Sequence, residues 1–175
     1  MKKWLIVVDM QNDFITGSLG SSDAISIVPY VKNKIAKYRK DGNRIIFTKD
    51  THSDKYLETQ EGKYLPVKHC IKGTDGHEIV SDLDIGDSII FEKPTFGSLE
   101  LVEFLESQEG IDDVDEIELC GLCTDICVVS NALILKAKFP EIKITVDANA
   151  CAGVTKESHE AALLTMRMCQ VNVGE

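Results

Sequence analysis

Gly121-Leu122-Cys123-Thr124-Asp125-Ile126-Cys127-Val128 is the stretch that decides the fold. Before it, residues 116–122 alternate apolar and polar side chains as a strand does, and after it residues 128–138 carry apolar side chains at helical spacing. A strand, a tight turn and a helix therefore meet within a few residues. Thr124 is a good N-cap for this helix, which places Cys127 at about the third position of its first turn.

A thiol at that position lies at the positive end of the helix dipole, close to unpaired backbone N–H groups. The dipole and the N–H groups both favour the thiolate, and the N–H groups can also bind an oxyanion. We therefore expect Cys127 to be a nucleophile. The alternative is that Cys127 is a small core cysteine behind an ordinary helix cap.

The rest of the chain continues this alternation of strands and helices. We expect strands at residues 4–8, 44–49, 88–92, 116–122 and 142–146, with a short last strand at 171–173. Helical spacing is found at residues 28–38, with Pro29 in the first turn, and at 101–105, 128–138 and 156–169. The pattern predicts an α/β fold, a three-layer, doubly wound and mostly parallel sheet of five or six strands with helices on both faces.

Residues 50–87 show no sustained periodicity, yet their apolar and aromatic content indicates that they are ordered, as functional loops of this length are. A chain of 175 residues with 43% apolar content fits a single domain, residues 1–175. The net charge of −10, without a basic cluster, argues against nucleic acid or an anionic membrane as partner.

The beginning of the chain has no signal-peptide core, so we expect the protein in the cytoplasm. In that reducing compartment the six cysteines are expected to be free thiols. Cys120, Cys123 and Cys127 form a C-x2-C-x3-C run that could hold an iron–sulfur cluster or zinc. However, alternate residues of a strand face opposite sides, so these thiols are not expected to converge.

Four reactive side chains are expected at one edge of the sheet. Asp9 ends the first strand, Asp50 the second and Lys93 the third, while Cys127 lies just past the fourth. In such sheets, ligands bind beyond the carboxyl ends of the strands. The position of all four side chains at this edge therefore favours a catalytic role for Cys127 over a packing role. Taken singly, Asp9 could cap a loop and Lys93 could be a solvated strand end.

A metal site is also indicated. The Asp50-x-His52 spacing puts two ligands on one side of an extended segment, and His69 follows after the loop. The alternative is that His52 and His69 form hydrogen bonds within the loop without a metal. His77 and His159 have no partners at ligand spacing, and we expect them to serve the structure.

These segments together resemble the isochorismatase-like cysteine hydrolases, and within them the nicotinamidase-like branch. The resemblance covers most of the chain, in the right order, and rests on residues 7–14, 48–52, 69–76, 92–96, 121–128 and 147–152. It implies a catalytic triad of Asp9, Lys93 and Cys127. It also implies an oxyanion hole made by the backbone N–H groups of Cys123 and Cys127, with a cis peptide bond between Leu122 and Cys123.

The resemblance further implies a divalent metal bound by Asp50, His52, His69 and a glutamate. Glu61 is the first candidate for the glutamate and Glu58 the second. The donor set suits zinc, manganese or iron and does not choose among them. Members of this branch hold the substrate between aromatic side chains, which here implies Phe14 and, at a shifted position, Tyr64.

The implied activity is hydrolysis of nicotinamide, or a similar small carboxamide, to the acid and ammonia through a cysteine thioester. Such an enzyme would serve NAD salvage, and the family resemblance suggests a homo-oligomer. One alternative is another carbon–nitrogen hydrolase of the family that acts on a carbamoyl or ureido compound without metal. Another alternative is a catalytically silent scaffold that has kept the fold.

Overall fold

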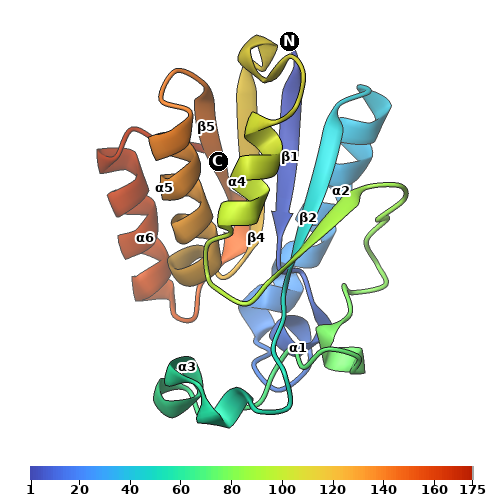
Figure 1. The fold of residues 1–175 in the computed structure, drawn as a ribbon, viewed down its shortest axis with the longest axis vertical. Coiled ribbons are helices and arrows are strands. Elements are labelled where there is room, and N and C mark those ends of the chain that lie inside the picture. Colours follow the sequence, from blue (N-terminus) through green and yellow to red (C-terminus); the bar gives the residue numbers. More distant parts are fainter. Residues whose placement is uncertain (175) are drawn as a thin grey trace.

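The computed structural model describes residues 1–174, which form a six-stranded sheet with the order β3-β2-β1-β4-β5-β6 (Figure 1). Every pair of neighbouring strands is parallel, so the predicted α/β class is confirmed and the sheet is parallel throughout. The strands are β1 (Lys3–Val8), β2 (Arg44–Asp50), β3 (Ile89–Lys93), β4 (Glu116–Leu122), β5 (Lys143–Ala152) and β6 (Asn172–Gly174).

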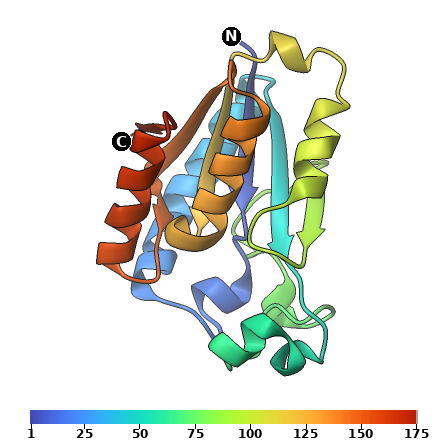
Figure 2. The same ribbon diagram turned by 60° about the vertical axis from the view of Figure 1, so that its left-hand side comes forward.

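Helices cover both faces of the sheet, with α2 on one face and α4, α5 and α6 on the other (Figures 1 and 2). The α-helices are α1 (Asn12–Ile15), α2 (Ser22–Lys40), α3 (Gln60–Tyr64), α4 (Leu99–Glu106), α5 (Val129–Lys138) and α6 (Lys156–Met168). Four short helices complete the chain: η1 (Tyr56–Glu58), η2 (Asp75–His77), η3 (Ile111–Asp113) and the π-helix η4 (Thr124–Val128). None of the helices within residues 1–174 has the length and apolar character needed to cross a bilayer.

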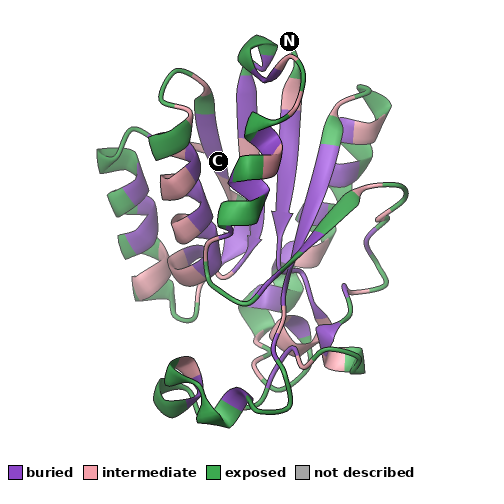
Figure 3. Ribbon diagram, viewed as in Figure 1, coloured by how far each residue is buried: buried purple, intermediate pink, exposed green. Residues whose placement is uncertain are grey.

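The central strands form the core because helices exclude water from both of their faces. Residues 5–8 of β1 are fully buried, and Figure 3 shows β1, β2 and β4 as almost continuously buried strands. A parallel strand in this position can be apolar at every residue, which is why residues 4–8 are a continuous apolar run.

The strand order fixes where a ligand can bind. From β1 the chain passes to β2 and β3 on one side, whereas β4, β5 and β6 follow on the other side. The connections that leave β1 and β4 therefore diverge and open a crevice at the carboxyl ends of these two strands. In Figure 1, α1, α3 and the segment between β2 and β3 gather below that edge.

Gly121 permits the close approach of β1 and β4 at this point. Its φ is +117°, and a Cβ atom there would lie 2.1 Å from the carbonyl oxygen of Val8. Any other residue at position 121 would force the two central strands apart.

Two element boundaries differ from the predictions by six residues. The helix expected at residues 28–38 begins at Ser22, because the Ser21 hydroxyl accepts the N–H of Ala24 and caps it there. Pro29 thus lies inside α2, on its exposed side, where water can satisfy the carbonyl group left unpaired. The strand expected at 142–146 continues to residue 152, because its second half pairs with β4 at Gly121.

Candidate active site

Three side chains from different strand ends meet in one buried cluster. Asp9 directly follows β1, Lys93 ends β3 and Cys127 lies in η4, just past β4. Oδ2 of Asp9 lies 2.6 Å from Nζ of Lys93, and that ammonium group donates to Sγ of Cys127 at 3.4 Å. All three residues are at most 5% exposed. A carboxylate, an ammonium group and a thiol are therefore in contact and shielded from water.

Burial and the neighbouring charges favour the protonated form of the Cys127 thiol. Burial raises the pKa of the Cys127 thiol and the Asp9 carboxylate raises it further, while Lys93 lowers it. Burial also raises the pKa of Asp9, against the charge of Lys93. Burial lowers the pKa of Lys93, but the charges of Asp9 and Cys127 outweigh this effect and raise it. These pKa shifts favour a protonated thiol on Cys127, whereas its position at the start of a helix favours the thiolate.

The turn that carries Cys127 also differs from the expected start of an α-helix. Thr124–Val128 form a π-helix, a wide form that occurs mostly at functional sites. Thr124 does not cap this helix, because its hydroxyl lies 2.8 Å from Nδ1 of His159 on α6. The peptide bond before this turn, between Leu122 and Cys123, is cis as expected.

Asn131 ties this turn to the loop before α4. Its buried amide donates to the carbonyl oxygen of Cys127 at 2.8 Å and accepts the N–H of Ser98 at 3.0 Å. Sequence reasoning missed Asn131, because Ser98 lies 33 residues away in the chain.

Four further side chains converge beside this cluster. One donor atom from each of Asp50, His52, Glu61 and His69 lies within 4.8 Å of the other three. Oδ2 of Asp50 is 2.9 Å from Nε2 of His52 and 3.3 Å from Nε2 of His69. Nδ1 of His69 is 2.9 Å from the carbonyl oxygen of Val67, which leaves Nε2 for a metal ion. Two imidazoles and two carboxylates in this arrangement fit a divalent metal ion.

The second glutamate candidate, Glu58, is exposed on η1 and does not belong to this group, whereas Glu61 does. Burial on its own raises the pKa of Asp50, but hydrogen bonds from His52 and His69 outweigh it and hold that pKa well below its usual range. Asp50 is therefore a carboxylate that could bind a metal ion.

Two side chains that sequence reasoning missed hold the carboxylates in place. The hydroxyl of Thr48 donates to Oδ1 of Asp9 at 2.6 Å. The amide of Gln11 binds both backbone groups of Asp50, accepting its N–H at 2.8 Å and donating to its carbonyl oxygen at 2.8 Å. Both residues are fully buried, so these bonds are shielded from water.

A cavity of about 580 Å³ opens onto Cys127 and onto three members of the metal group, Asp50, Glu61 and His69. No lysine or arginine is among the described residues that line it. Apolar side chains form most of the remaining wall, among them Phe14, Leu65, Phe96, Ile126 and Val154.

The two expected aromatic contacts differ in their placement. The ring of Phe14 lies 5.5 Å from that of His69, between centroids, and forms part of the cavity wall. Tyr64 also lines the cavity but is 85% exposed, so it lies at the rim.

Comparisons with known proteins find a family model and solved structures that this chain resembles. The isochorismatase domain model matches residues 3–175. The nicotinamidase/pyrazinamidase of Mycobacterium tuberculosis is 27% identical over 97% of this chain and 96% of that protein. The zinc complex of Pyrococcus horikoshii pyrazinamidase is 28% identical, with a TM-score of 0.84 over 100% of this chain and 99% of the other. The N-carbamoylsarcosine amidase of Thermoplasma acidophilum is 25% identical, with a TM-score of 0.80 over 100% of this chain and 96% of the other.

Proposed function

The chain belongs to the isochorismatase family, and from this premise we propose that it is a nicotinamidase-type amidohydrolase. It would convert a small uncharged carboxamide, such as nicotinamide, to the acid and ammonia through a thioester on Cys127. The observation that carries the proposal is the buried contact of Cys127 with Lys93 and of Lys93 with Asp9, at the wall of a cavity beside four metal-ligand side chains.

The first step transfers the thiol proton to Asp9 while sulfur attacks the carboxamide carbon. Because burial and the Asp9 carboxylate raise the pKa of the Cys127 thiol, we expect attack on the carbon and transfer of the proton to be coupled. Oδ2 of Asp9 is the oxygen that would take the proton, since Oδ1 already accepts the hydroxyl of Thr48. Lys93 stabilises the negative charge on sulfur during this transfer.

The remaining steps return the proton and release both products. The backbone N–H groups of Cys123 and Cys127 stabilise the oxyanion of the tetrahedral intermediate. Asp9 then gives its proton to the departing nitrogen, the carbon–nitrogen bond breaks and ammonia leaves. A water molecule, deprotonated by Asp9, attacks the thioester, and the acid leaves as the proton returns to sulfur.

Asp50, His52, Glu61 and His69 would hold a divalent metal ion next to this chemistry. A bound metal ion supplies an electrophilic centre to which a ring nitrogen or a water molecule can bind. Zinc is the first metal to test, because the pyrazinamidase of P. horikoshii was solved in complex with zinc.

The lining of the cavity favours a neutral amide over a carbamoyl acid. The likeness to an N-carbamoylsarcosine amidase supports carbamoyl hydrolysis as the alternative activity. A substrate with a carboxylate needs a cationic partner, and the described lining contains no lysine or arginine. A flat heteroaromatic ring instead fits the apolar wall beside Phe14.

The test is ammonia release from nicotinamide, pyrazinamide and carbamoylated amino acids, with metal content measured on the same samples. We expect release from the two heteroaromatic amides and about one metal ion per chain. The His52→Ala, His69→Ala double variant should lose the metal and most of the activity. Ammonia from carbamoyl compounds alone would overturn the nicotinamidase proposal in favour of the alternative. Ammonia from none of them would overturn the proposed substrate class.

A further inference from the structure

The turn that carries Cys127, η4, forms side-chain contacts with α6, a helix that contributes no residue to the Asp9–Lys93–Cys127 cluster. Thr124 opens η4, three residues before Cys127, and is fully buried. Its hydroxyl lies 2.8 Å from Nδ1 of His159, in the second turn of α6. The buried hydroxyl of Thr124 therefore does not cap its own helix, and it instead contacts the imidazole of His159, which is distant in the sequence.

The next residue of the turn is fastened to the same part of α6. The carboxylate of Asp125 accepts the hydroxyl of Ser158 and the N–H of Val154, the latter at 3.0 Å. Two consecutive residues of η4 thus bind the start of α6 through their side chains. The π-helix has no side-chain cap of its own, so these contacts help to orient it, together with the hydrogen bond from Asn131 to the carbonyl oxygen of Cys127.

We propose that His159 is a positioning residue for Cys127 and acts through the hydroxyl of Thr124. Its effect on turnover rests on the proposed amidohydrolase function. Without the bond to His159, η4 can rotate and carry Sγ away from Lys93, which is 3.4 Å from it. A displacement of roughly 1 Å at a reacting atom costs about 100-fold in rate.

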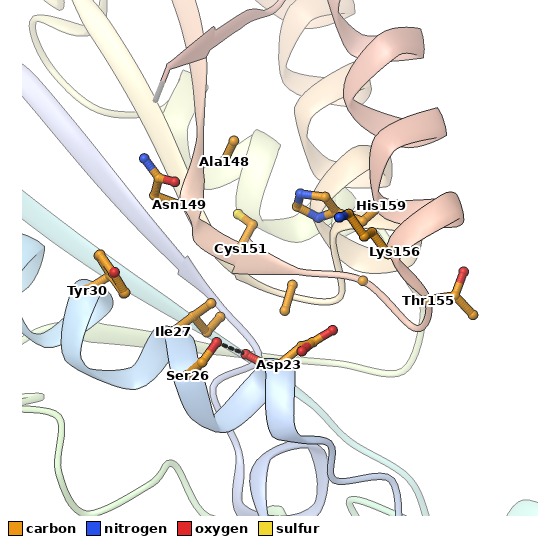
Figure 4. A pocket seen from close by; sticks show the side chains of 12 residues that line it. Asp23, Ser26, Ile27, Tyr30, Ala148, Asn149, Cys151, Thr155, Lys156 and His159 are labelled. Carbon is orange, nitrogen blue, oxygen red and sulfur yellow. Dashed lines mark hydrogen bonds between the residues drawn. The ribbon is translucent and has the colours of Figure 1, made fainter.

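His159 can also be reached from solvent. It lines a second cavity, of about 290 Å³, between α2 and α6 (Figure 4). Figure 4 shows the imidazole on α6 and, across the cavity, Tyr30 on α2. Truncation of His159 would enlarge this cavity directly beside Thr124, so free imidazole could enter and replace the lost ring.

The test combines five variants with a control. His159→Ala and Thr124→Val remove either side of the bond, and the double variant measures whether the two act as one unit. His159→Asn places an amide group where Nδ1 lies, whereas His159→Gln places it too far along the side chain. Lys156→Ala is the control, because Lys156 lines the same cavity from the same helix and forms no hydrogen bond to η4 among the described contacts.

Two rates are measured: kcat for the amide, and alkylation of Cys127 by iodoacetamide, read from the mass of the peptide that contains it. We expect His159→Ala and Thr124→Val each to lower both rates about 10- to 100-fold, with the double variant no slower than either. His159→Asn and added imidazole should restore most of the loss, and His159→Gln should not. Lys156→Ala should match the wild type.

Additive effects of the two single variants would overturn the proposal, as would alkylation of His159→Ala at or above the wild-type rate. Failure of imidazole to restore a folded His159→Ala variant would do the same. If the wild type hydrolyses no amide, the proposed function fails, but the alkylation rates still decide whether His159 positions the sulfur.

Discussion

Each oxygen of the Asp9 carboxylate has its own neighbour. Oδ1 accepts the hydroxyl of Thr48, and Oδ2 faces the ammonium group of Lys93. The residue follows β1 with a φ of +47°, a conformation that a non-glycine residue seldom adopts, and its backbone N–H binds the carbonyl oxygen of Thr48 at 3.2 Å. Thr48 therefore occupies Oδ1, so Oδ2, which is paired with Lys93, is the oxygen that would take the proton of Cys127.

Replacement of Thr48 by valine keeps the shape of the side chain and removes this hydrogen bond. A hydrogen bond to a charged group contributes about 1.5–3 kcal/mol, so we expect kcat to fall about 10- to 100-fold. KM should change little, because Thr48 does not line the substrate cavity. Steady-state kinetics on a hydrolysed amide measure both quantities.

Thr145→Val is the matched control. Thr145 is also a buried threonine whose hydroxyl donates to a carboxylate at 2.6 Å, in this case Glu116. It should lose stability without losing kcat. Equal losses of kcat in the two variants would show that Thr48 contributes only to folding.

The sequence indicates the reactive residues better than the residues that support them. Asp9, Asp50 and Lys93 each end an expected strand, so parallel strands alone predict that they share an edge. Thr48, Gln11 and Asn131 gave no such signal, because each is a common polar residue and its partner is far away in the sequence. The raised pKa of the Cys127 thiol was missed because helix position alone does not reveal its burial.

Among the elements, the paired carboxyl ends of β1 and β4 position the site, and Gly121 permits their close approach. Gly121→Ala would place a methyl group 2.1 Å from the carbonyl oxygen of Val8, at a φ of +117°. We expect the free energy of unfolding to fall by about 2–5 kcal/mol, from overpacking and backbone strain together. Chemical denaturation measures this change.

Gly42→Ala separates the two causes. Gly42 also has a positive φ, +69°, but a Cβ atom there would meet nothing within 4 Å. Its loss should be about 1–2 kcal/mol, from the backbone alone. If Gly42→Ala proves as damaging as Gly121→Ala, the close approach of the two strands is not what requires glycine at position 121.

Strands were predictable where apolar residues form a clear pattern. The strand expected at 116–122 is found with the same bounds, and β1, β2 and β3 are each shifted or extended by a single residue. Two-sided burial leaves a continuous apolar signal in β1, whereas the more exposed β3 is marked by its apolar residues 89–91. The second half of β5 was missed because Asp147 and Asn149 interrupt that signal. The start of α2 was missed because Pro29 suggested a first turn, and η4 because π-helices have no sequence signature of their own.

For the molecule as a whole, acid stability depends on a carboxylate at the end of the sheet opposite the site. Glu116 begins β4 and lies 2.5 Å from Nζ of Lys3 and 2.9 Å from Nζ of Lys143. Burial alone would raise its pKa, but these lysines and Thr145 lower it from 4.5 to about 2. A lowered folded-state pKa stabilises the fold above the unfolded pKa, and the benefit disappears as the pH falls through the folded one.

Glu116→Gln should therefore lower the free energy of unfolding at pH 7. The difference from the wild type should shrink as the pH falls below about 4.5 and should vanish near pH 2. Denaturation curves collected across this range measure it. Glu141→Gln, at an exposed position, is the control and should change stability little at any pH. A difference that grows towards low pH would reverse the assigned sign.

In the molecule as a whole, we propose that the ends of the parallel strands bring a sulfur, an acid and an ammonium group together for acyl transfer. A single turnover of nicotinamide tests this, with the enzyme in excess, the reaction quenched in acid, and the protein and its peptides analysed by mass. We expect one transient nicotinoyl group on the peptide that contains Cys127, and none on a Cys127→Ala variant of equal metal content. Ammonia released at the same rate by both proteins, without that adduct, would contradict it.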